Sequence, residues 1–154
     1  MIGSSLARWA LTGAAVLAIA ACGSVATPAA TRSAKASIVM TATKTVSGKS
    51  ETVLTNQQGL TLYWFKPDSA TMIVCTGGCA ASWPPLVAPT GSLQAPAGLT
   101  GTLSTLDGAN GHQVLYNGHP LYTYSKDKDS GDVYGDGVGG KWFVATPGLT
   151  PTSG

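Results

Sequence analysis

The sequence predicts an all-β fold in which a small domain is built from two tandem β repeat units behind a flexible N-terminal tether. The first observation is a repeat: when the chain is shifted by 59 residues against itself, identical residues coincide. The coinciding pairs are Gly59 and Gly118, Leu62 and Leu121, Tyr63 and Tyr122, Asp68 and Asp127, Gly78 and Gly137, and Trp83 and Trp142. The second is the interruption of every possible amphipathic helix between residues 51 and 147 by Gly, Pro or Thr. Self-similarity at a fixed period indicates one supersecondary unit used twice, with both copies burying a shared core.

The centre of the first repeat is expected to be a buried strand. In residues 61–65 (TLYWF), a period of two places Tyr63 and Phe65 on one face. Leu62 and Trp64 fall on the other face. Because both faces are apolar, we expect this strand to be covered on both sides.

A tight hairpin is expected in the second repeat. Asn117 and Gly118 form the pair that most favours the positive φ angles of a two-residue turn. Residues 113–116 are therefore expected to pair antiparallel with residues 121–124. A further strand is expected from residue 101 to residue 106, turning back into this hairpin.

The repeat domain is predicted to span residues 51–147, with repeat 1 at about 51–88 and repeat 2 at about 102–147. The stretch between the copies, residues 88–101, is rich in Pro and Gly and is expected to be a connection. Neither copy is expected to fold alone.

Residues 1–21 predict a lipoprotein signal peptide. They contain a single charge, Arg8, followed by a twelve-residue uncharged run from 10 to 21. This run is typical of a signal-peptide core and is too short to span a bilayer, which needs about 20 apolar residues. It ends in IAACG, which resembles the bacterial lipobox, so Cys22 is expected to receive lipid, including palmitate, and to become the mature N-terminus. The alternative is an ordinary signal peptide with a chance cysteine.

A lipidated Cys22 would place the protein in the bacterial cell envelope, anchored on the outer face of the cytoplasmic membrane or facing the periplasm. Residues 22–50 are expected to be this cysteine and a flexible linker, which contains no acidic residue and has a reach of roughly 30 Å. Its four basic residues can be attracted to anionic lipid, or the segment can be a simple spacer.

The charge balance argues against a nucleic-acid partner. The chain has 9 Lys and Arg against 7 Asp and Glu, and removal of residues 1–21 takes away Arg8 and leaves 8 basic residues. Binding through phosphate neutralisation needs a much larger excess of basic residues. The expected partners are the membrane, through the lipid anchor, and an envelope protein or a glycan.

A six-residue motif occurs once in each repeat. YWFKPD at 63–68 and YTYSKD at 122–127 both fit the pattern Y-x-[FWY]-x-x-D. Its candidate residues are Tyr63, Phe65, Asp68, Tyr122, Tyr124 and Asp127. With CTGGCAASWPPL and NGHPLYTY, the motif makes residues 51–147 resemble the predicted bacterial lipoproteins named for it, also described as a secreted repeat of unknown function. The resemblance implies a lipid-anchored tandem-repeat envelope protein and supplies no catalytic residue.

Cys75 and Cys79 lie four residues apart in a glycine-containing loop. In an exported protein they are expected to form a structural disulfide, which would stabilise the fold by roughly 2 kcal/mol. The alternative is a pair of soft thiolate ligands for copper or another metal, or a redox-active pair. The spacing differs from the C-x-x-C of thioredoxin-like sites and the C-x-x-C-H of haem attachment.

Asp68 and Asp127 follow the motif strands, where a carboxylate can accept hydrogen bonds from backbone N–H groups. The functional alternative joins Tyr63 to Asp68 and Tyr122 to Asp127 as two equivalent binding pockets. Residues 127–136 also carry four Asp, which suggests either a solvated acidic loop or a weak calcium site, although they do not fit an EF-hand.

The sequence predicts a non-enzymatic binding or structural module of the envelope, with no cofactor. It contains no G-x-S-x-G, H-E-x-x-H or phosphate-binding loop motif. The alternative is a metal-binding or electron-transfer accessory protein that uses Cys75, Cys79 and a histidine. His112 and His119 flank the predicted hairpin and are expected to be exposed turn residues.

Overall fold

The computed structural model describes residues 37–89 and 93–152. The predicted signal peptide, Cys22 and the first part of the predicted linker lie outside the described residues. Within the two described ranges, no helix is long and apolar enough to cross a membrane.

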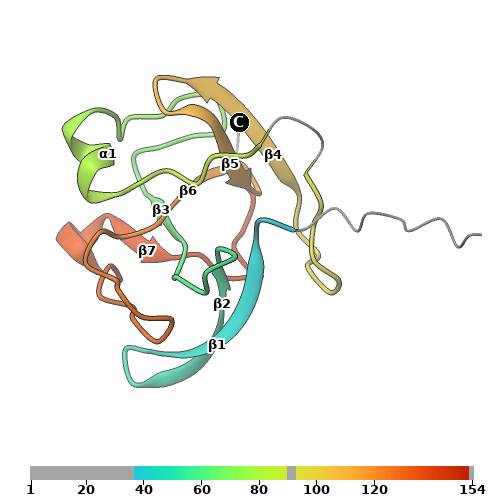
Figure 1. Cartoon of the computed structure of the whole chain (residues 1–154), viewed down its shortest axis with the longest axis vertical. Helices are drawn as coiled ribbons and strands as arrows, with labels where there is room; N and C mark the ends of the chain where they lie inside the picture. Colours follow the sequence, from blue (N-terminus) through green and yellow to red (C-terminus); the bar gives the residue numbers. More distant parts are fainter. Residues whose placement is uncertain (1–36, 90–92, 153–154) are drawn as a thin grey trace, which may run out of the picture. The chain divides into compact units, whose positions relative to one another are not determined.

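The prediction of an all-β fold is confirmed (Figure 1). The described elements, in chain order, are β1 (Met40–Val46), β2 (Lys49–Thr55), β3 (Tyr63–Phe65), α1 (Gly78–Ser82), β4 (Leu103–Gly108), β5 (Gly111–Tyr116), β6 (His119–Tyr122), the 3₁₀ turn η1 (Val138–Gly140) and β7 (Trp142–Val144). The short helix α1 was not predicted, because its five residues are fewer than a periodic pattern needs to be visible.

The strands form two antiparallel sheets. β1 and β2 pair as a hairpin, and the other five strands follow the order β4-β5-β6-β3-β7. The hairpin is joined to the larger sheet at β7, because the Leu54 N–H donates to the Ala145 carbonyl at 2.8 Å. The Leu62 N–H in turn donates to the Leu54 carbonyl at 2.9 Å.

The predicted linker is wrong at its C-terminal end. Residues 40–50 do not form a flexible tether, because β1 and the start of β2 belong to the folded domain. Alternation along β1 buries Lys44 and Val46 and exposes the intervening Thr45. Threonine favours strands as well as spacers, so the polar composition of this segment concealed a strand that is half buried.

The two repeats are related by an approximate twofold axis that passes through the β3–β6 pair. Tyr63 pairs with Tyr122, so two residues that coincide at the shift of 59 lie opposite each other. The hydrogen bonds that flank this pair are also duplicated. The Lys66 N–H donates to the Lys141 carbonyl at 2.8 Å, and the Ser125 N–H donates to the Ser82 carbonyl at 2.9 Å. The repeats therefore share one sheet.

The two copies differ most at the strand equivalent to β7. In repeat 1 that segment contains Pro84 and Pro85, which have no N–H to donate to a ladder. It is reduced to isolated bridges, in which Pro85 pairs with Tyr122 and Val87 pairs with Gln113.

The core lies on both faces of the shared sheet. Leu62 and Leu121 belong to one buried cluster, and Tyr63 and Tyr122 belong to the other. All four side chains are fully buried, which confirms the expectation that the motif strand is covered on both sides.

The predicted hairpin turn of repeat 2 is confirmed, but the expected pairing of residues 113–116 with residues 121–124 is wrong in register. Because the turn contains only two residues, β6 begins at His119, Leu115 pairs with Pro120, and Gln113 forms a bridge with Val87. Asn117 and Gly118 have φ angles of 49° and 82°, as a two-residue hairpin turn requires. Tyr116 pairs with His119 across the turn, and β4 precedes this hairpin as an antiparallel neighbour of β5.

Candidate functional site

The motif tyrosines and aspartates form hydrogen bonds between the repeats. The Tyr63 hydroxyl donates to Asp127 Oδ2 at 2.6 Å, and the Tyr122 hydroxyl donates to Asp68 Oδ2 at 2.5 Å. We call these two interactions the crossed pairs. The functional alternative that joined Tyr63 to Asp68 and Tyr122 to Asp127 is therefore wrong, because the antiparallel pairing of β3 and β6 presents each phenol to the loop of the opposite repeat.

Each aspartate of the crossed pairs also holds its own loop. Asp68 Oδ1 accepts the backbone N–H of Val74 at 2.7 Å and that of Cys75 at 3.4 Å. Asp127 Oδ1 accepts the Tyr134 N–H at 3.1 Å. Cys75 and Tyr134 are equivalent at the shift of 59, so both repeats use the carboxylate in the same way.

Burial shifts the pKa values of three of these groups, Tyr63, Tyr122 and Asp127. Both tyrosines are 0% exposed, while Asp68 and Asp127 are 7% and 4% exposed. Burial raises the pKa of Tyr63 and of Tyr122, and the hydrogen bond to a carboxylate raises it further, because the ionised phenol would face a second negative charge. Burial also raises the pKa of Asp127, against the lowering effect of the hydrogen bond from Tyr63.

One crossed pair requires a glycine. The Gly135 N–H donates to the Tyr63 hydroxyl oxygen at 3.2 Å. A Cβ at residue 135 would lie 2.7 Å from Cζ of the Tyr63 ring, which is closer than any side chain allows. The glycine-rich acidic loop is thus shaped around this phenol.

A stack of four rings runs between the repeats. The distance between ring centroids is 4.3 Å from Phe65 to Trp142, 3.7 Å from Trp142 to Trp83, and 4.1 Å from Trp83 to Tyr124. Rings of the two repeats alternate along this four-ring stack, and the two indoles are inclined by only 2°. Each tryptophan also packs edge to face with the first motif tyrosine of its own repeat. The ring centroids of Trp83 and Tyr63 are 5.5 Å apart, and those of Trp142 and Tyr122 are 5.1 Å apart. Sequence reasoning did not predict the stack, although the coincidence of Trp83 and Trp142 was visible.

Residues 44–87 and 104–146 match, once for each repeat, the family described as secreted repeat of unknown function. The chain belongs to this family. No curated protein and no solved structure matches it. The first match begins inside β1, so the end of β1 and the whole of β2 belong to the secreted repeat and not to the linker.

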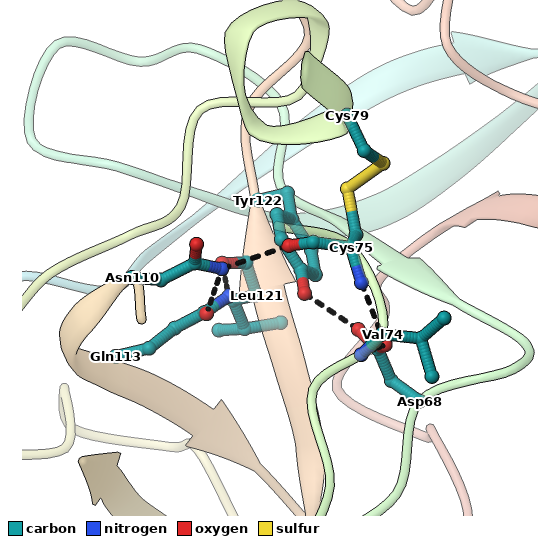
Figure 2. Close-up of a disulfide and its surroundings, with 8 residues drawn as sticks. All are labelled: Asp68, Val74, Cys75, Cys79, Asn110, Gln113, Leu121 and Tyr122. Atoms are coloured by element: carbon teal, nitrogen blue, oxygen red, sulfur yellow. Dashed lines mark hydrogen bonds between the residues drawn. A yellow bond between two sulfur atoms is a disulfide. The ribbon is translucent and has the colours of Figure 1, made fainter. Parts of the chain in front are cut away.

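The disulfide of the secreted repeat braces one crossed pair (Figure 2). Cys75 and Cys79 are bonded, which confirms the predicted structural disulfide, and Cys79 lies in α1. The Asn110 side-chain amide donates to the Cys75 carbonyl at 2.9 Å and to Gln113 Oε1 at 2.9 Å. Gln113 Nε2 donates onward to the Leu121 carbonyl at 3.0 Å. In this oxidised form the two sulfurs are not the free thiolates that the metal-binding alternative requires.

Three of the four aspartates of the acidic loop, Asp127, Asp132 and Asp136, accept hydrogen bonds from different partners. Asp132 Oδ2 accepts the backbone N–H groups of Lys128 and Asp129 at 2.7 Å and 2.9 Å, and these bonds lower the pKa of the Asp132 carboxyl. Asp136 Oδ1 accepts the Val144 N–H at 3.2 Å. In the described part of the chain, no group of three or more His, Cys, Asp and Glu is arranged to hold a metal ion.

The two histidines have different environments. His112 Nδ1 lies 2.6 Å from Asp107 Oδ1 at the β4–β5 hairpin. His119 was expected to be an exposed turn residue, and this is wrong, because it is only 8% exposed. Its Nε2 lies 2.9 Å from the Thr150 carbonyl, and its ring lies 4.7 Å from the ring of Trp64.

Lys44 is a buried cation that sequence reasoning assigned to the linker. Its Nζ donates to the Gly59 carbonyl at 2.9 Å and to Thr61 Oγ1 at 2.7 Å. Burial lowers the pKa of the Lys44 amine, while the charges of Asp127 and Asp132 act in the opposite direction. The two carboxylates therefore favour the ammonium form of Lys44 against the effect of its burial.

Proposed function

We propose that this secreted repeat is a lipid-anchored, non-enzymatic module of the bacterial envelope, in which the motif residues stabilise the junction of the two repeats. The observation that carries the proposal is the set of crossed pairs. All four polar side chains are buried and already have partners within the protein.

The crossed pairs are poorly suited to catalysis. A general acid or base must reach the substrate and needs a pKa near the working pH. Tyr63 and Tyr122 are fully buried, and their pKa values are raised away from neutrality. Their phenols are therefore expected to act as permanent hydrogen-bond donors.

The sequence of residues 1–22 supports the lipid anchor, because a short apolar core followed by IAACG resembles a lipobox. The Cys75–Cys79 disulfide supports an oxidising compartment outside the cytoplasm. The family description, a secreted repeat, agrees with both.

The test is to express the full chain in a bacterium and to analyse the membrane fraction by mass spectrometry. The expected mature protein begins at Cys22, carries acyl chains on that residue and contains the Cys75–Cys79 bond. Cys22→Ala should move the protein to the soluble fraction, while the matched control Cys75→Ser should leave it on the membrane. An uncleaved leader, or a Cys22→Ala protein that is still acylated, would contradict the anchor.

A separate test asks whether the motif residues are structural and not catalytic. It measures how substitutions of these residues change the stability of the protein. Asp68→Asn and Asp127→Asn are expected to lower the free energy of unfolding in proportion to the hydrogen bonds lost. Turnover of a defined envelope substrate that either variant abolishes without a change in stability would contradict the proposal.

A further inference from the structure

A groove lies where the tip of the β1–β2 hairpin meets the β7 edge of the large sheet. It has a volume of about 530 Å³, and the residues that line it include Ser47, Lys49, Glu51, Trp64, Asp136 and Phe143. None of these six side chains belongs to the crossed pairs or to the four-ring stack.

The floor of the groove is aromatic. Trp64 on β3 and Phe143 on β7 are partners in the sheet register, and their ring centroids are 5.3 Å apart with a tilt of 33°. The ring of His119 contacts Trp64 at 4.7 Å and is itself held by the Thr150 carbonyl. A floor fixed in this way loses little conformational freedom when a ligand binds.

The walls of the groove are polar and carry both signs of charge. Lys49 and Glu51 are exposed on β2, and Asp136 faces them from the acidic loop, where Ser47 donates to its Oδ2 at 3.4 Å. A polymer with many charges of one sign would meet a like charge here. The walls instead suit a neutral ligand with hydroxyl groups, which can donate to the carboxylates and accept from the ammonium.

The edge of the sheet beside the groove is already occupied by hydrogen bonds. The Val144 N–H donates to Asp136 Oδ1 at 3.2 Å, and the Ala145 carbonyl accepts the Leu54 N–H at 2.8 Å. A peptide that added a strand to β7 would need these backbone groups free. The edge therefore disfavours a peptide in extended form.

The aromatic floor of the groove, to which each repeat contributes one ring, is not duplicated at the position related to it by the shift of 59. The residues equivalent to Trp64 and Phe143 at the shift of 59 are Thr123 and Pro84, which provide no aromatic floor. The β1–β2 hairpin is also longer than its counterpart. The backbone N–H groups of Leu54 and Val114 donate equivalent hydrogen bonds to the shared sheet. Leu54 lies six residues after Gly48, the second residue of its hairpin turn, whereas Val114 lies only four residues after Asn110, the second residue of the equivalent turn. The repeat fold needs neither the rings nor the longer hairpin.

We propose that this groove binds a neutral sugar ring of a cell-envelope glycan. The apolar face of a pyranose carries C–H groups with partial positive charge, which pack on the negative faces of aromatic rings, while its rim of hydroxyl groups reaches the polar walls. This inference rests on the proposed function for one point, the envelope as the source of the glycan. The groove itself does not depend on the lipid anchor.

The test measures binding to the full-length protein purified from whole-cell extract in a detergent without a sugar headgroup. The probes are two neutral oligosaccharides, tetra-N-acetylchitotetraose and cellotetraose, titrated by calorimetry and by tryptophan fluorescence. We expect saturable binding of at least one probe below about 10 mM. Because the readout is binding in detergent, a protein that lacks the lipid still gives a valid result, and the two proposals can fail separately.

Variants locate the site. Trp64→Ala should weaken binding at least about tenfold, whereas Trp64→Phe, which keeps a ring, should retain most of it. Glu51→Gln, on an exposed strand position, should weaken binding about threefold without a change in fold. The matched control is Tyr134→Ala, which removes an aromatic ring that is 66% exposed outside the groove and should leave the affinity unchanged.

Three results would overturn the proposal. The first is the lack of saturable binding of both oligosaccharides by the unmodified protein. The second is equal affinity in the unmodified protein, Trp64→Ala and Glu51→Gln. The third is saturable binding of tetramethylammonium chloride in place of the sugars, since a cation can also bind between aromatic rings and carboxylates.

Discussion

Asp127 illustrates how a single residue of this protein is stabilised. Its carboxylate is buried, and it accepts one hydrogen bond from the Tyr63 phenol and one from the Tyr134 backbone. Removal of the phenol would leave a buried carboxylate with an unfilled acceptor. A hydrogen bond to a charged group contributes about 1.5–3 kcal/mol, so each crossed pair is a substantial part of the stability of a domain this small.

The crossed arrangement predicts which substitutions are coupled. Tyr63→Phe and Asp127→Asn should show a coupling energy of about 1–3 kcal/mol in a double-mutant cycle. Tyr63→Phe and Asp68→Asn should be additive within about 0.5 kcal/mol, because they do not share a hydrogen bond. Urea unfolding of the single and double variants measures both values. Coupling of Tyr63 to Asp68 in place of Asp127 would contradict the observed pairing.

The same phenols predict a loss of stability at alkaline pH. The pKa values of Tyr63 and Tyr122 are raised in the folded state above the unfolded value of about 10, so the folded protein keeps protons that the unfolded chain releases. Their contribution is complete below pH 10 and is lost as the pH rises, by up to about 1.4 kcal/mol per pH unit for each tyrosine.

Urea unfolding between pH 8 and pH 11, a range that spans the tyrosine value of about 10, checks this expectation. Tyr63→Phe should halve the slope above pH 10, because it removes one of the two phenols whose pKa is raised. An unchanged slope in Tyr63→Phe would show that the phenol is not protected.

Residue types were easier to predict than their partners. The sequence showed that Asp68 and Asp127 follow strands, where carboxylates accept backbone N–H groups, and both do so. It did not show that each tyrosine bonds to the aspartate of the other repeat. That choice depends on the register of β3 against β6, a long-range contact that neither repeat encodes locally.

At the scale of elements, the loop that carries the disulfide is held at Cys75 by two connections. Cys75 is bonded to Cys79 in α1, and its N–H donates to Asp68, the acceptor of Tyr122. The bond therefore limits the freedom of a loop on which one crossed pair depends.

The disulfide is expected to stabilise the fold by about 2 kcal/mol, because it closes a short loop. Cys75→Ala/Cys79→Ala should lower the urea midpoint accordingly and should leave the slope of the unfolding transition unchanged. Reduction of the unmodified protein with dithiothreitol should give the same shift, and dithiothreitol should have no effect on the double variant. A reduced protein as stable as the oxidised one would contradict the role of the bond as a brace.

Two hairpins of the molecule differed in how well they could be predicted. The turn at Asn117 and Gly118 has a strong local signal, and the sequence predicted its position. The turn at Ser47 and Gly48 was missed. Its strand β1 consists of Thr, Ala, Lys, Met and Val, and only one of its faces is buried, which gave the segment the composition of a spacer.

At the scale of the whole molecule, the four-ring stack joins the repeats through side chains as the sheet joins them through the backbone. Trp83 and Trp142 are buried at its centre and are related by the shift of 59. The repeat period therefore predicted the shared core, although a sequence cannot show that equivalent rings would stack on each other.

Truncation of a central ring is expected to have a large effect. Trp83→Ala and Trp142→Ala should each lower the free energy of unfolding by about 3–5 kcal/mol, because each opens a cavity between two other rings. Tyr134→Ala, outside the core, should change it by less than about 0.5 kcal/mol. Thermal unfolding followed by circular dichroism compares the three variants. A tryptophan variant as stable as the Tyr134 control would mean that the core closes around the missing ring.

The pairing of Tyr63 with Tyr122 has a consequence for how such a chain can be divided. Each half supplies a phenol whose acceptor is on the other half, and two rings of the stack that alternate with the rings of the other half. Two separate polypeptides, one for each half, should remain unstructured when alone and should fold when mixed. A polypeptide that contained a single half could form these hydrogen bonds and ring contacts only with a second copy of itself. A symmetric homodimer of that kind is the simplest ancestor that this architecture allows.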